Sequence, residues 1–163
     1  MIFVTVGTHE QPFNRLVEYM DQWAAEHEES VIMQTGFSTY EPKHCEWSKL
    51  YPYSQMVELV EKARIVITHG GPSSFIMPLQ IGKVPIVVPR KKEYDEHVND
   101  HQLIFAKAVA ERQGNIIVVE NEKDIAEILK SYEDIVAAMP ATLKSNNLSF
   151  NKNLEKIVEK LFE

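Results

Sequence analysis

The stretch that decides the fold is RIVITHGGPSS, residues 64–74. It begins as a short β-branched run, which is typical of a fully buried strand. It then breaks at two glycines and continues, after a proline and two serines, as FIMPLQI, residues 75–81. This order predicts a strand, a glycine turn and a helix that is capped by Ser73 or Ser74, with Pro78 in or near its first turn.

A turn of this composition can build an anion site. Gly70 and Gly71 have no Cβ, so the backbone can approach a ligand closely. The start of the helix presents free N–H groups and a partial positive charge, and the hydroxyls of Ser73 and Ser74 can donate to phosphate oxygens. A purely structural βα turn explains the same residues equally well, because such turns are common in α/β folds.

Strand-like and helix-like segments alternate along the rest of the chain. Besides the central run, strands are expected at 2–6, 31–34, 84–89 and 116–119, with a short edge strand near 45–51. Apolar residues recur at helical spacing in 13–24, 54–63, 98–114, 121–129 and 150–162, and a polar connector is expected at 140–149. This alternation predicts a Rossmann-like α/β fold: a doubly wound parallel sheet with helices on both faces.

In such a sheet the ligand site lies at the carboxyl ends of the strands, at the point where the strand order reverses. Two loops are candidates for this site. One is Gly7-Thr8-His9 after the first strand, and the other is His69-Gly70-Gly71 after the central strand. If the order reverses between these strands, both loops face one crevice. For His69, contact with a ligand is favoured over a purely structural role. For His9, a role as catalytic base is considered but is less favoured.

Composition narrows the class of protein. The 163 residues suit a single domain, and 44% of them are hydrophobic, which predicts a packed core. The net charge of −7 argues against nucleic-acid binding. One cysteine, no basic leader at the N-terminus and no apolar run of about 20 residues indicate a cytoplasmic chain without a membrane span.

The histidines do not predict a metal centre. Six are present, but only His97 and His101 have a tight spacing, i and i+4, and a place in the ligand site or on the surface explains this pair better. A GxGxxG motif is absent, which counts against a dinucleotide enzyme.

Several motifs, in this order, resemble the C-terminal domain of glycosyltransferase family 28. They are FVTVGT at 3–8, THGG at 68–71, GK at 82–83 followed by PIVVPR at 85–90, and HQ at 101–102. The resemblance covers about residues 1–120. Within that family the chain looks like the short stand-alone subunits similar to Alg13, and like the EpsF- and PssE-like proteins of bacterial exopolysaccharide or capsule clusters.

The resemblance implies that residues 1–163 form one domain, equivalent to the donor-binding half of a GT-B glycosyltransferase. Family members use a UDP-sugar without a cofactor or an essential metal. In the split enzymes, a membrane-associated Alg14-like subunit binds a lipid-linked acceptor, which would hold this chain at the inner face of the membrane. Because a lone half exposes an apolar face, the helix at 150–162 is either a packing element or a docking surface, and a homodimer is the alternative to a heteromeric partner.

The predicted site combines this resemblance with the chemistry of the residues. His101 and Gln102 match family positions that touch the donor, and Arg90 and Asn99 lie near them in the sequence. Arg90 could add a cation, although a solvated loop explains the charges of 90–96 as well. His9 is the candidate base, unless the base lies on the partner. The residues expected to bind the donor are Gly7, Thr8, His69, Gly70, Gly71, Ser73, Ser74, Arg90, Asn99, His101 and Gln102.

One position departs from the family pattern. In many relatives a glutamate after the glycine turn holds the ribose hydroxyls, and the matching residue here is Met77, which cannot accept those hydrogen bonds. Glu93, Asp95 or Glu96 could replace it. Three functions therefore stay open: the donor subunit of a split enzyme, a non-catalytic helper of a catalytic partner, or an unrelated nucleotide-binding α/β protein.

Overall fold

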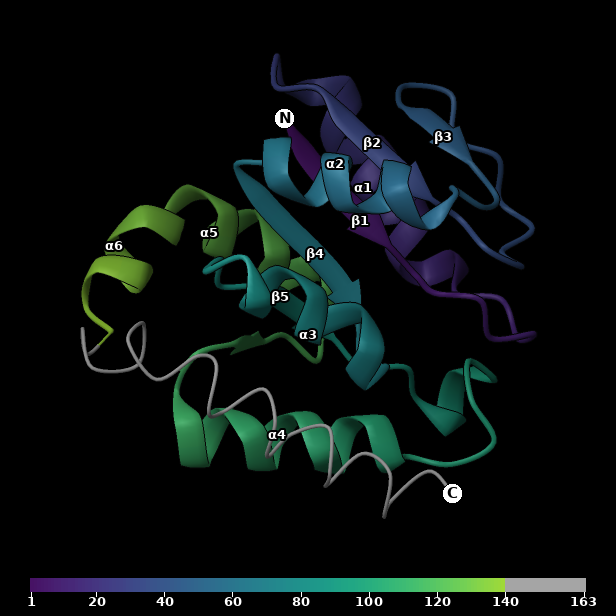
Figure 1. The fold of residues 1–163 in the computed structure, drawn as a ribbon. Helices are drawn as coiled ribbons and strands as arrows, with labels where there is room; N and C mark the ends of the chain where they lie inside the picture. The colour runs from purple at the N-terminus through teal and green to yellow at the C-terminus, as the bar shows by residue number, and fades with distance from the viewer. Residues whose placement is uncertain (140–163) are drawn as a thin grey trace.

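The computed structural model describes residues 1–139, and its centre is a six-stranded sheet in which every neighbouring pair is parallel (Figure 1). The strand order is β3-β2-β1-β4-β5-β6. The predicted fold class and the edge position of the strand near 45–51 are confirmed. The strands are β1 Ile2–Thr5, β2 Val31–Gln34, β3 Glu46–Ser48, β4 Ile65–His69, β5 Ile86–Val88 and β6 Ile117–Val118.

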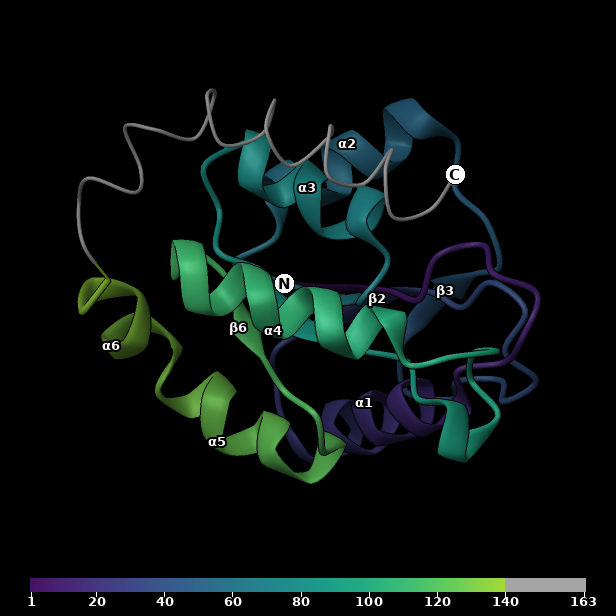
Figure 2. The ribbon, with the colours of Figure 1, turned by 90° about the horizontal axis from the view of Figure 1, so that it is seen from below.

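Helices cover both faces of the sheet and give the described part of the chain three layers (Figure 2). The core beneath α1, α5 and α6 is separate from the cores beneath α2, α3 and α4. The α-helices are α1 Asn14–Glu26, α2 Tyr53–Lys62, α3 Pro72–Gln80, α4 His101–Gln113, α5 Ile125–Lys130 and α6 Tyr132–Ala137, and the short 3₁₀ turns are η1 Lys92–Tyr94 and η2 Glu122–Asp124.

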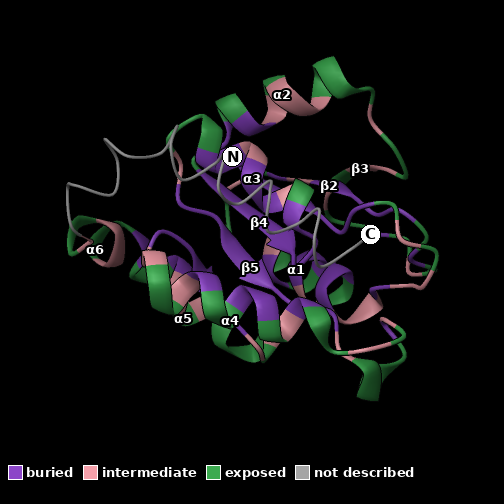
Figure 3. Cartoon of the chain, turned by 60° about the horizontal axis from the view of Figure 1, so that its bottom comes forward, coloured by how far each residue is buried: buried purple, intermediate pink, exposed green. Residues whose placement is uncertain are grey.

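Strand β1 shows why the centre of the sheet is stable. Successive side chains of a strand point to opposite faces, so Ile2 and Val4 pack under α1 while Phe3 packs under α2. All three side chains are fully buried. Figure 3 shows the same pattern for residues 1–139, with buried residues on the strands and on the inward sides of the helices.

The strand order reverses at β1. The chain runs outward from β1 through β2 to β3, and then returns to place β4 on the opposite side of β1. Residues Ile2 and Thr5 of β1 pair in register with Ile65 and Thr68 of β4. The loops after β1 and β4 therefore leave the sheet side by side, as the sequence predicts for one shared crevice.

Helix α3 begins earlier than the sequence indicates. Gly71 is its N-cap, Pro72 is its first residue, and neither serine caps it through its side chain. The expected serine cap is therefore wrong, because proline suits the first helical position, where no N–H is needed. Pro78 consequently lies in the helix interior. The helix ends two residues later, where Gly82 at φ +87° follows and Lys83 N–H donates to the Pro78 carbonyl at 2.9 Å.

Other boundaries differ less. The helix expected over 98–114 begins at His101, and Val98 is an exposed loop residue. Asn121 accepts a hydrogen bond from Lys123 N–H and begins the turn that leads into α5, as predicted. The predicted connector at 140–149 and the helix at 150–162 lie outside the described residues. Across residues 1–139, no helix is both long and apolar enough to cross a membrane.

Candidate functional site

The candidate site is an open cleft of about 710 Å³ at the carboxyl ends of β1 and β4. The loops after these strands and the start of α3 form its polar wall, and α2 with Met77 of α3 forms its apolar wall. Eight of the predicted site residues line it: Gly7, Thr8, His9, His69, Gly71, Ser73, Ser74 and Gln102. The sequence missed several other lining residues, which are Thr5, Gln34, Tyr51, Tyr53, Met56, Val60, Pro72 and His97.

His69 is clamped between two glycines. An added Cβ on Gly7 would lie 2.3 Å from His69 Nε2, and one on Gly71 would lie 2.2 Å from His69 Cε1. The space that these glycines leave open beside the ring is thus filled by an imidazole of this chain, and Gly71 itself lines the cleft. Gly70 is different, since a Cβ there would meet Gln102 and Pro89.

The hydrogen bonds of His69 determine where its proton lies. Gly71 N–H donates to Nδ1 at 3.2 Å, and the Gln102 amide lies 3.4 Å from the same nitrogen. Because a backbone N–H can only donate, Nδ1 is an acceptor and Nε2 carries the hydrogen. Nε2–H then donates to Ser74 Oγ at 2.9 Å. The hydroxyl hydrogen of Ser74 is therefore left for a ligand oxygen.

The imidazole of His69 stays neutral near pH 7. Burial, followed by the positive charge of Arg90, lowers its pKa to about 3. In the ligand-free chain His69 accordingly acts through hydrogen bonds, and it can orient Ser74 in this way.

The start of α3 offers fewer free amides than the sequence predicts. Pro72 has no N–H, Gly71 N–H is used by His69, and Ser74 N–H donates to Gly71 O at 3.0 Å. Ser73 N–H has no partner within residues 1–139. At this end of α3 the donors left for a ligand are this amide and the hydroxyls of Ser73 and Ser74, with the helix dipole behind them. We call His69, Ser73 and Ser74 the cleft wall.

Two further imidazoles lie at the cleft. The rings of His9 and His97 stack with their centroids 4.4 Å apart. His9 Nε2 lies 2.9 Å from Gln11 Oε1. Burial, and then the nearby His9 and Arg90, lower the pKa of His97. The sequence singled out His97 only for its spacing to His101, whereas the structure pairs it with His9.

Arg90 does not line the cleft. Its side chain is fully buried, and its terminal nitrogens donate to the carbonyls of Val6 and Gln11, both at 2.6 Å, and of Glu96 at 3.1 Å. Only Nε lacks a partner among residues 1–139. The expectation of a solvated loop is wrong at this residue, because the guanidinium ties the loop after β1 to the loop after β5.

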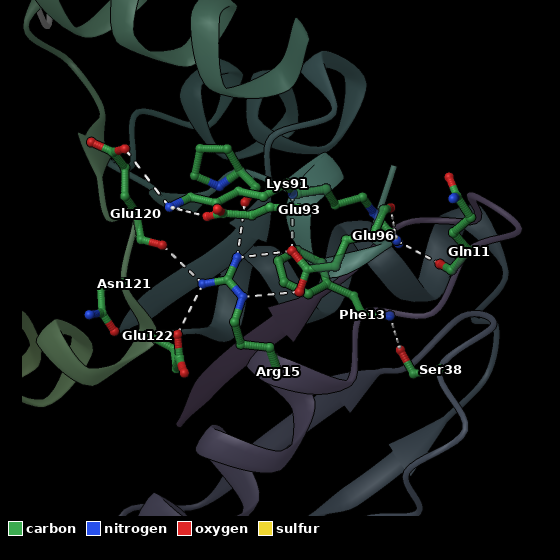
Figure 4. A network of polar contacts seen from close by, with 12 residues as sticks. Gln11, Phe13, Arg15, Ser38, Lys91, Glu93, Glu96, Glu120, Asn121 and Glu122 are labelled. Atoms are coloured by element: carbon green, nitrogen blue, oxygen red, sulfur yellow. Dashed lines mark hydrogen bonds and ion pairs between the residues drawn. The ribbon is translucent and has the colours of Figure 1, made fainter. Parts of the chain in front are cut away.

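Arg15 of α1 completes this second polar centre (Figure 4). Its guanidinium makes two hydrogen bonds of 3.0 Å to the carboxylate of Glu96, and a third of 3.1 Å to Glu122. Glu96 is buried and also accepts from Lys91 N–H at 3.0 Å. We call Arg15, Arg90 and Glu96 the arginine cluster. Its bonds fix the loop that carries His97.

The acidic residues proposed to replace the ribose-binding glutamate do not reach the cleft. Glu96 belongs to the arginine cluster, and Glu93 and Asp95 are exposed elsewhere on the loop. No described residue that lines the cleft is an aspartate or a glutamate. Met77 does line it, on the apolar wall with Tyr51, Tyr53, Met56 and Val60.

Asn99 and His101 lie outside the cleft lining, although Gln102 next to them belongs to it. Asn99 Oδ1 accepts from His101 N–H at 3.0 Å and shapes the start of α4, and the His101 side chain is exposed. Gln102 is buried, and its Oε1 accepts from Arg90 N–H at 3.1 Å. Gln102 thereby joins the cleft wall to the arginine cluster. Among residues 1–139, no group of three or more His, Cys, Asp or Glu could hold a metal ion.

The fold and the cleft define a class: a Rossmann-like domain with an open cleft at the switch point of its sheet. The model of the glycosyltransferase family 28 C-terminal domain matches residues 1–161, so the chain belongs to this family. The match extends well beyond the 120 residues that carry the motif resemblance. No curated protein matches the chain.

Solved structures share the fold. The calicheamicin glycosyltransferase CalG4 has a TM-score of 0.61 and 16% identity, over 95% of this chain and 38% of that one. The glycosyltransferase SnogD from Streptomyces nogalater has a TM-score of 0.58 and 17% identity, over 98% and 42%. The glycotransferase of kitacinnamycin has a TM-score of 0.60 and 17% identity, over 95% and 39%. The chain thus spans about two fifths of each structure, and its fold matches the C-terminal half of GT-B glycosyltransferases.

Proposed function

We propose that this domain binds a UDP-sugar in the cleft and acts as the donor-binding subunit of a two-component glycosyltransferase. The observation that carries the proposal is a cleft at the switch point, in a family 28 domain, whose polar wall has free donors and which no carboxylate of residues 1–139 lines. Such a lining suits a diphosphate, because no negative side chain opposes it and hydroxyl, amide and helix dipole are aimed at it.

In this pose the pyrophosphate lies against Ser73 and Ser74, and the nucleoside lies against Tyr51, Met56 and Met77. When the bond between the sugar carbon and the phosphate oxygen breaks, negative charge grows on the leaving UDP. The free Ser73 N–H and the two hydroxyls stabilise that charge where it develops, without a metal ion. The acceptor hydroxyl supplies the new bond and loses its proton to a base, for which His9 or a residue of the partner is proposed.

The acceptor and the partner are the remaining parts of the proposal. The chain spans about two fifths of the length of these solved structures, and a GT-B glycosyltransferase needs a second half. We propose that a membrane-associated Alg14-like subunit supplies it and presents a lipid-linked sugar, in exopolysaccharide or capsule biosynthesis. The domain would then work at the cytoplasmic face of the membrane. A homodimer is the alternative assembly.

One observation favours a second function. The cleft has no carboxylate near Met77 to bind the ribose hydroxyls, which weakens the case for tight donor binding by this chain alone. The chain would in that case be a non-catalytic helper that stabilises or stimulates its partner.

Calorimetric titration of UDP and UDP-glucose, onto the isolated chain and onto its complex with the partner, tests both functions. Binding to the chain or only to the complex, lost in the Ser73→Ala/Ser74→Ala variant, supports the donor subunit. No binding in either state, with sugar transfer by the partner still stimulated, supports the helper. Tight binding of an unrelated nucleotide in preference to UDP contradicts both.

A further inference from the structure

A second hollow lies beside the cleft, at the end of the sheet formed by β2 and β3. It has a volume of about 400 Å³, within the range of small-molecule sites. The loop 36–41 forms one side, and β3 with the residues after it forms the other. Its lining residues are Gly36, Phe37, Ser38, Thr39, Tyr40, Glu41, Trp47, Lys49 and Leu50. We call this hollow the β3 groove.

The lining combines aromatic surface with charge. Phe37 is 56% exposed and Leu50 is 58% exposed, while Tyr40 and Trp47 are half-buried. Large apolar side chains gathered at a hollow mark interaction sites. Glu41 and Lys49 are exposed on the same groove, and neither has an ion-pair partner among residues 1–139. The groove therefore offers flat apolar faces together with one free carboxylate and one free ammonium group.

The groove is held in a fixed shape by α1. Asn14 Oδ1 accepts from the backbone N–H groups of Thr39, at 2.9 Å, and Tyr40, at 3.0 Å. The buried carboxylate of Asp21 accepts from the Tyr40 hydroxyl at 2.7 Å, and from the N–H groups of Lys43 and His44. A loop tied at so many points loses little conformational freedom when a ligand binds.

The β3 groove adjoins the donor cleft. The two hollows are lined by consecutive segments: Gln34 and Tyr51 line the cleft, whereas Gly36 and Leu50 line the groove. The loops also touch directly, since an added Cβ on Gly36 would lie 2.4 Å from the Gly7 carbonyl oxygen. Both hollows therefore lie at the carboxyl end of the sheet, with Tyr40 and Trp47 on the face that α1 covers and Met56 and Met77 on the face that α2 covers.

We infer that the β3 groove is a saccharide subsite, which holds a pyranose ring of the acceptor. A pyranose has an apolar C–H face that packs on an aromatic ring, and a rim of hydroxyls that both donate and accept hydrogen bonds. Trp47, Tyr40 and Phe37 supply the rings, Glu41 accepts from hydroxyls and Lys49 donates to them. A purely apolar ligand would leave these charges unused, and a phosphate would meet Glu41. The role as an acceptor site rests on the proposed function.

Two-dimensional NMR of the full chain tests this subsite, because the chain contains two tryptophans that report on different places. Trp47 lines the groove, whereas Trp23 is packed in the core against His27. Their indole N–H signals are assigned with the Trp47→Phe and Trp23→Phe variants. Cellobiose, lactose and N,N′-diacetylchitobiose are then titrated to millimolar concentration. We expect one of these disaccharides to shift the Trp47 signal in a saturable way and to leave the Trp23 signal in place.

A matched pair of variants locates the binding. Glu41→Gln removes the carboxylate charge from the groove, and it is expected to weaken the binding of the disaccharide about tenfold. Glu46→Gln makes the same change on β3 at an exposed residue outside the groove lining, and should leave the affinity unchanged. Equal effects of the two variants would overturn the assignment.

The other outcomes are also decisive. If no disaccharide moves the Trp47 signal, or if both indole signals move together, the subsite is rejected. If 8-anilinonaphthalene-1-sulfonate moves the Trp47 signal and no disaccharide does, the groove is an apolar partner surface, and the proposal fails. The donor site is tested separately in the same spectra, where UDP should move the amide signals of Gly70 and Gly71. If UDP binds and no saccharide binds, the subsite is rejected and the donor function stands. If a saccharide binds and UDP does not, the donor function is rejected and the saccharide site stands.

Discussion

The arginine cluster and the cleft wall lie side by side at the carboxyl edge of the sheet, yet they use their hydrogen-bond donors differently. The guanidinium groups of Arg15 and Arg90 donate to backbone carbonyls and to the carboxylates of Glu96 and Glu122. The cleft wall keeps the Ser73 amide and two hydroxyls free. The sequence suggested Arg90 and the serines for the same task. The comparison teaches that the charged side chains hold the loops in place, whereas the spare hydrogen-bond capacity lies at the candidate site.

The largest effect on folding is expected from the arginine cluster. Arg90→Met should lower the free energy of unfolding by about 3–5 kcal/mol, because it removes a buried charge that ties two loops and leaves its carbonyl partners unsatisfied. Urea unfolding measures the loss. Lys92→Met, at an exposed position on the same loop, should change stability by less than about 0.5 kcal/mol. A loss below about 1 kcal/mol for Arg90→Met would contradict a structural role.

The clamp around His69 gives the next effect. Gly82→Ala is the reference variant, because Gly82 also has a positive φ, +87°, but nothing lies within 4 Å of an added Cβ. It should lower the free energy of unfolding by about 1 kcal/mol, the cost of the backbone strain alone. Gly7→Ala has a similar strain at φ +72°, and its Cβ also meets the imidazole, so it should cost about 1–2 kcal/mol more. It should also weaken UDP binding, measured by calorimetry, because the ring that orients Ser74 is displaced. Equal losses of stability in the two variants would show that the added Cβ at Gly7 does not clash with the His69 ring.

The cleft wall itself should affect binding rather than folding. Replacing both Ser73 and Ser74 with alanine is expected to weaken UDP binding by about 1–3 kcal/mol, the range for hydrogen bonds to a charged group. Ser73→Ala alone, at an exposed side chain, should keep the unfolding free energy within about 0.5 kcal/mol. Ser54→Ala, exposed on α2 and outside the cleft lining, is the control for affinity. Unchanged affinity in the double variant would place the phosphates elsewhere.

The last effect is a pH dependence. His69 has a pKa of about 3 in the folded chain and an ordinary value of 6.5. Between these values the unfolded chain binds the proton and the folded chain does not, so stability falls as the pH is lowered, by up to about 1.4 kcal/mol per pH unit. His69→Asn lacks this proton. In urea unfolding at pH 7, 6 and 5, the gap in stability between wild type and variant should shrink toward pH 5, and parallel curves would contradict the neutral, buried imidazole.

Much of the fold could be predicted from the sequence, because it depends on local patterns. Alternating β-branched runs and helical stripes indicate a parallel doubly wound sheet. Gly82 indicates the end of α3, because glycine readily adopts the positive φ found there. Asn121 indicates the approach to α5, because its side chain accepts a hydrogen bond from Lys123 N–H. The position of the cleft follows from the same reasoning, since the two glycine-containing loops lie after β1 and β4.

The rest depends on contacts between distant segments. The sequence shows that Arg90 is charged, but not that three carbonyls from two loops surround it. It shows Gly7 and Gly71, but not that the ring of His69 fills the space between them. His9 and His97 carry no shared pattern, and only the fold stacks them. The start of α3 differs from the prediction for a local reason: Pro72 takes the first helical position, so Ser73 and Ser74 lie inside the helix and do not cap it.

A crystal structure of the chain with UDP bound tests the central claim most directly. We predict phosphate oxygens within hydrogen-bond distance of the Ser73 N–H and the Ser74 hydroxyl, with Arg90 still bonded to its carbonyls. A diphosphate seated on Arg15 or Arg90, away from residues 69–74, would contradict this account of the cleft.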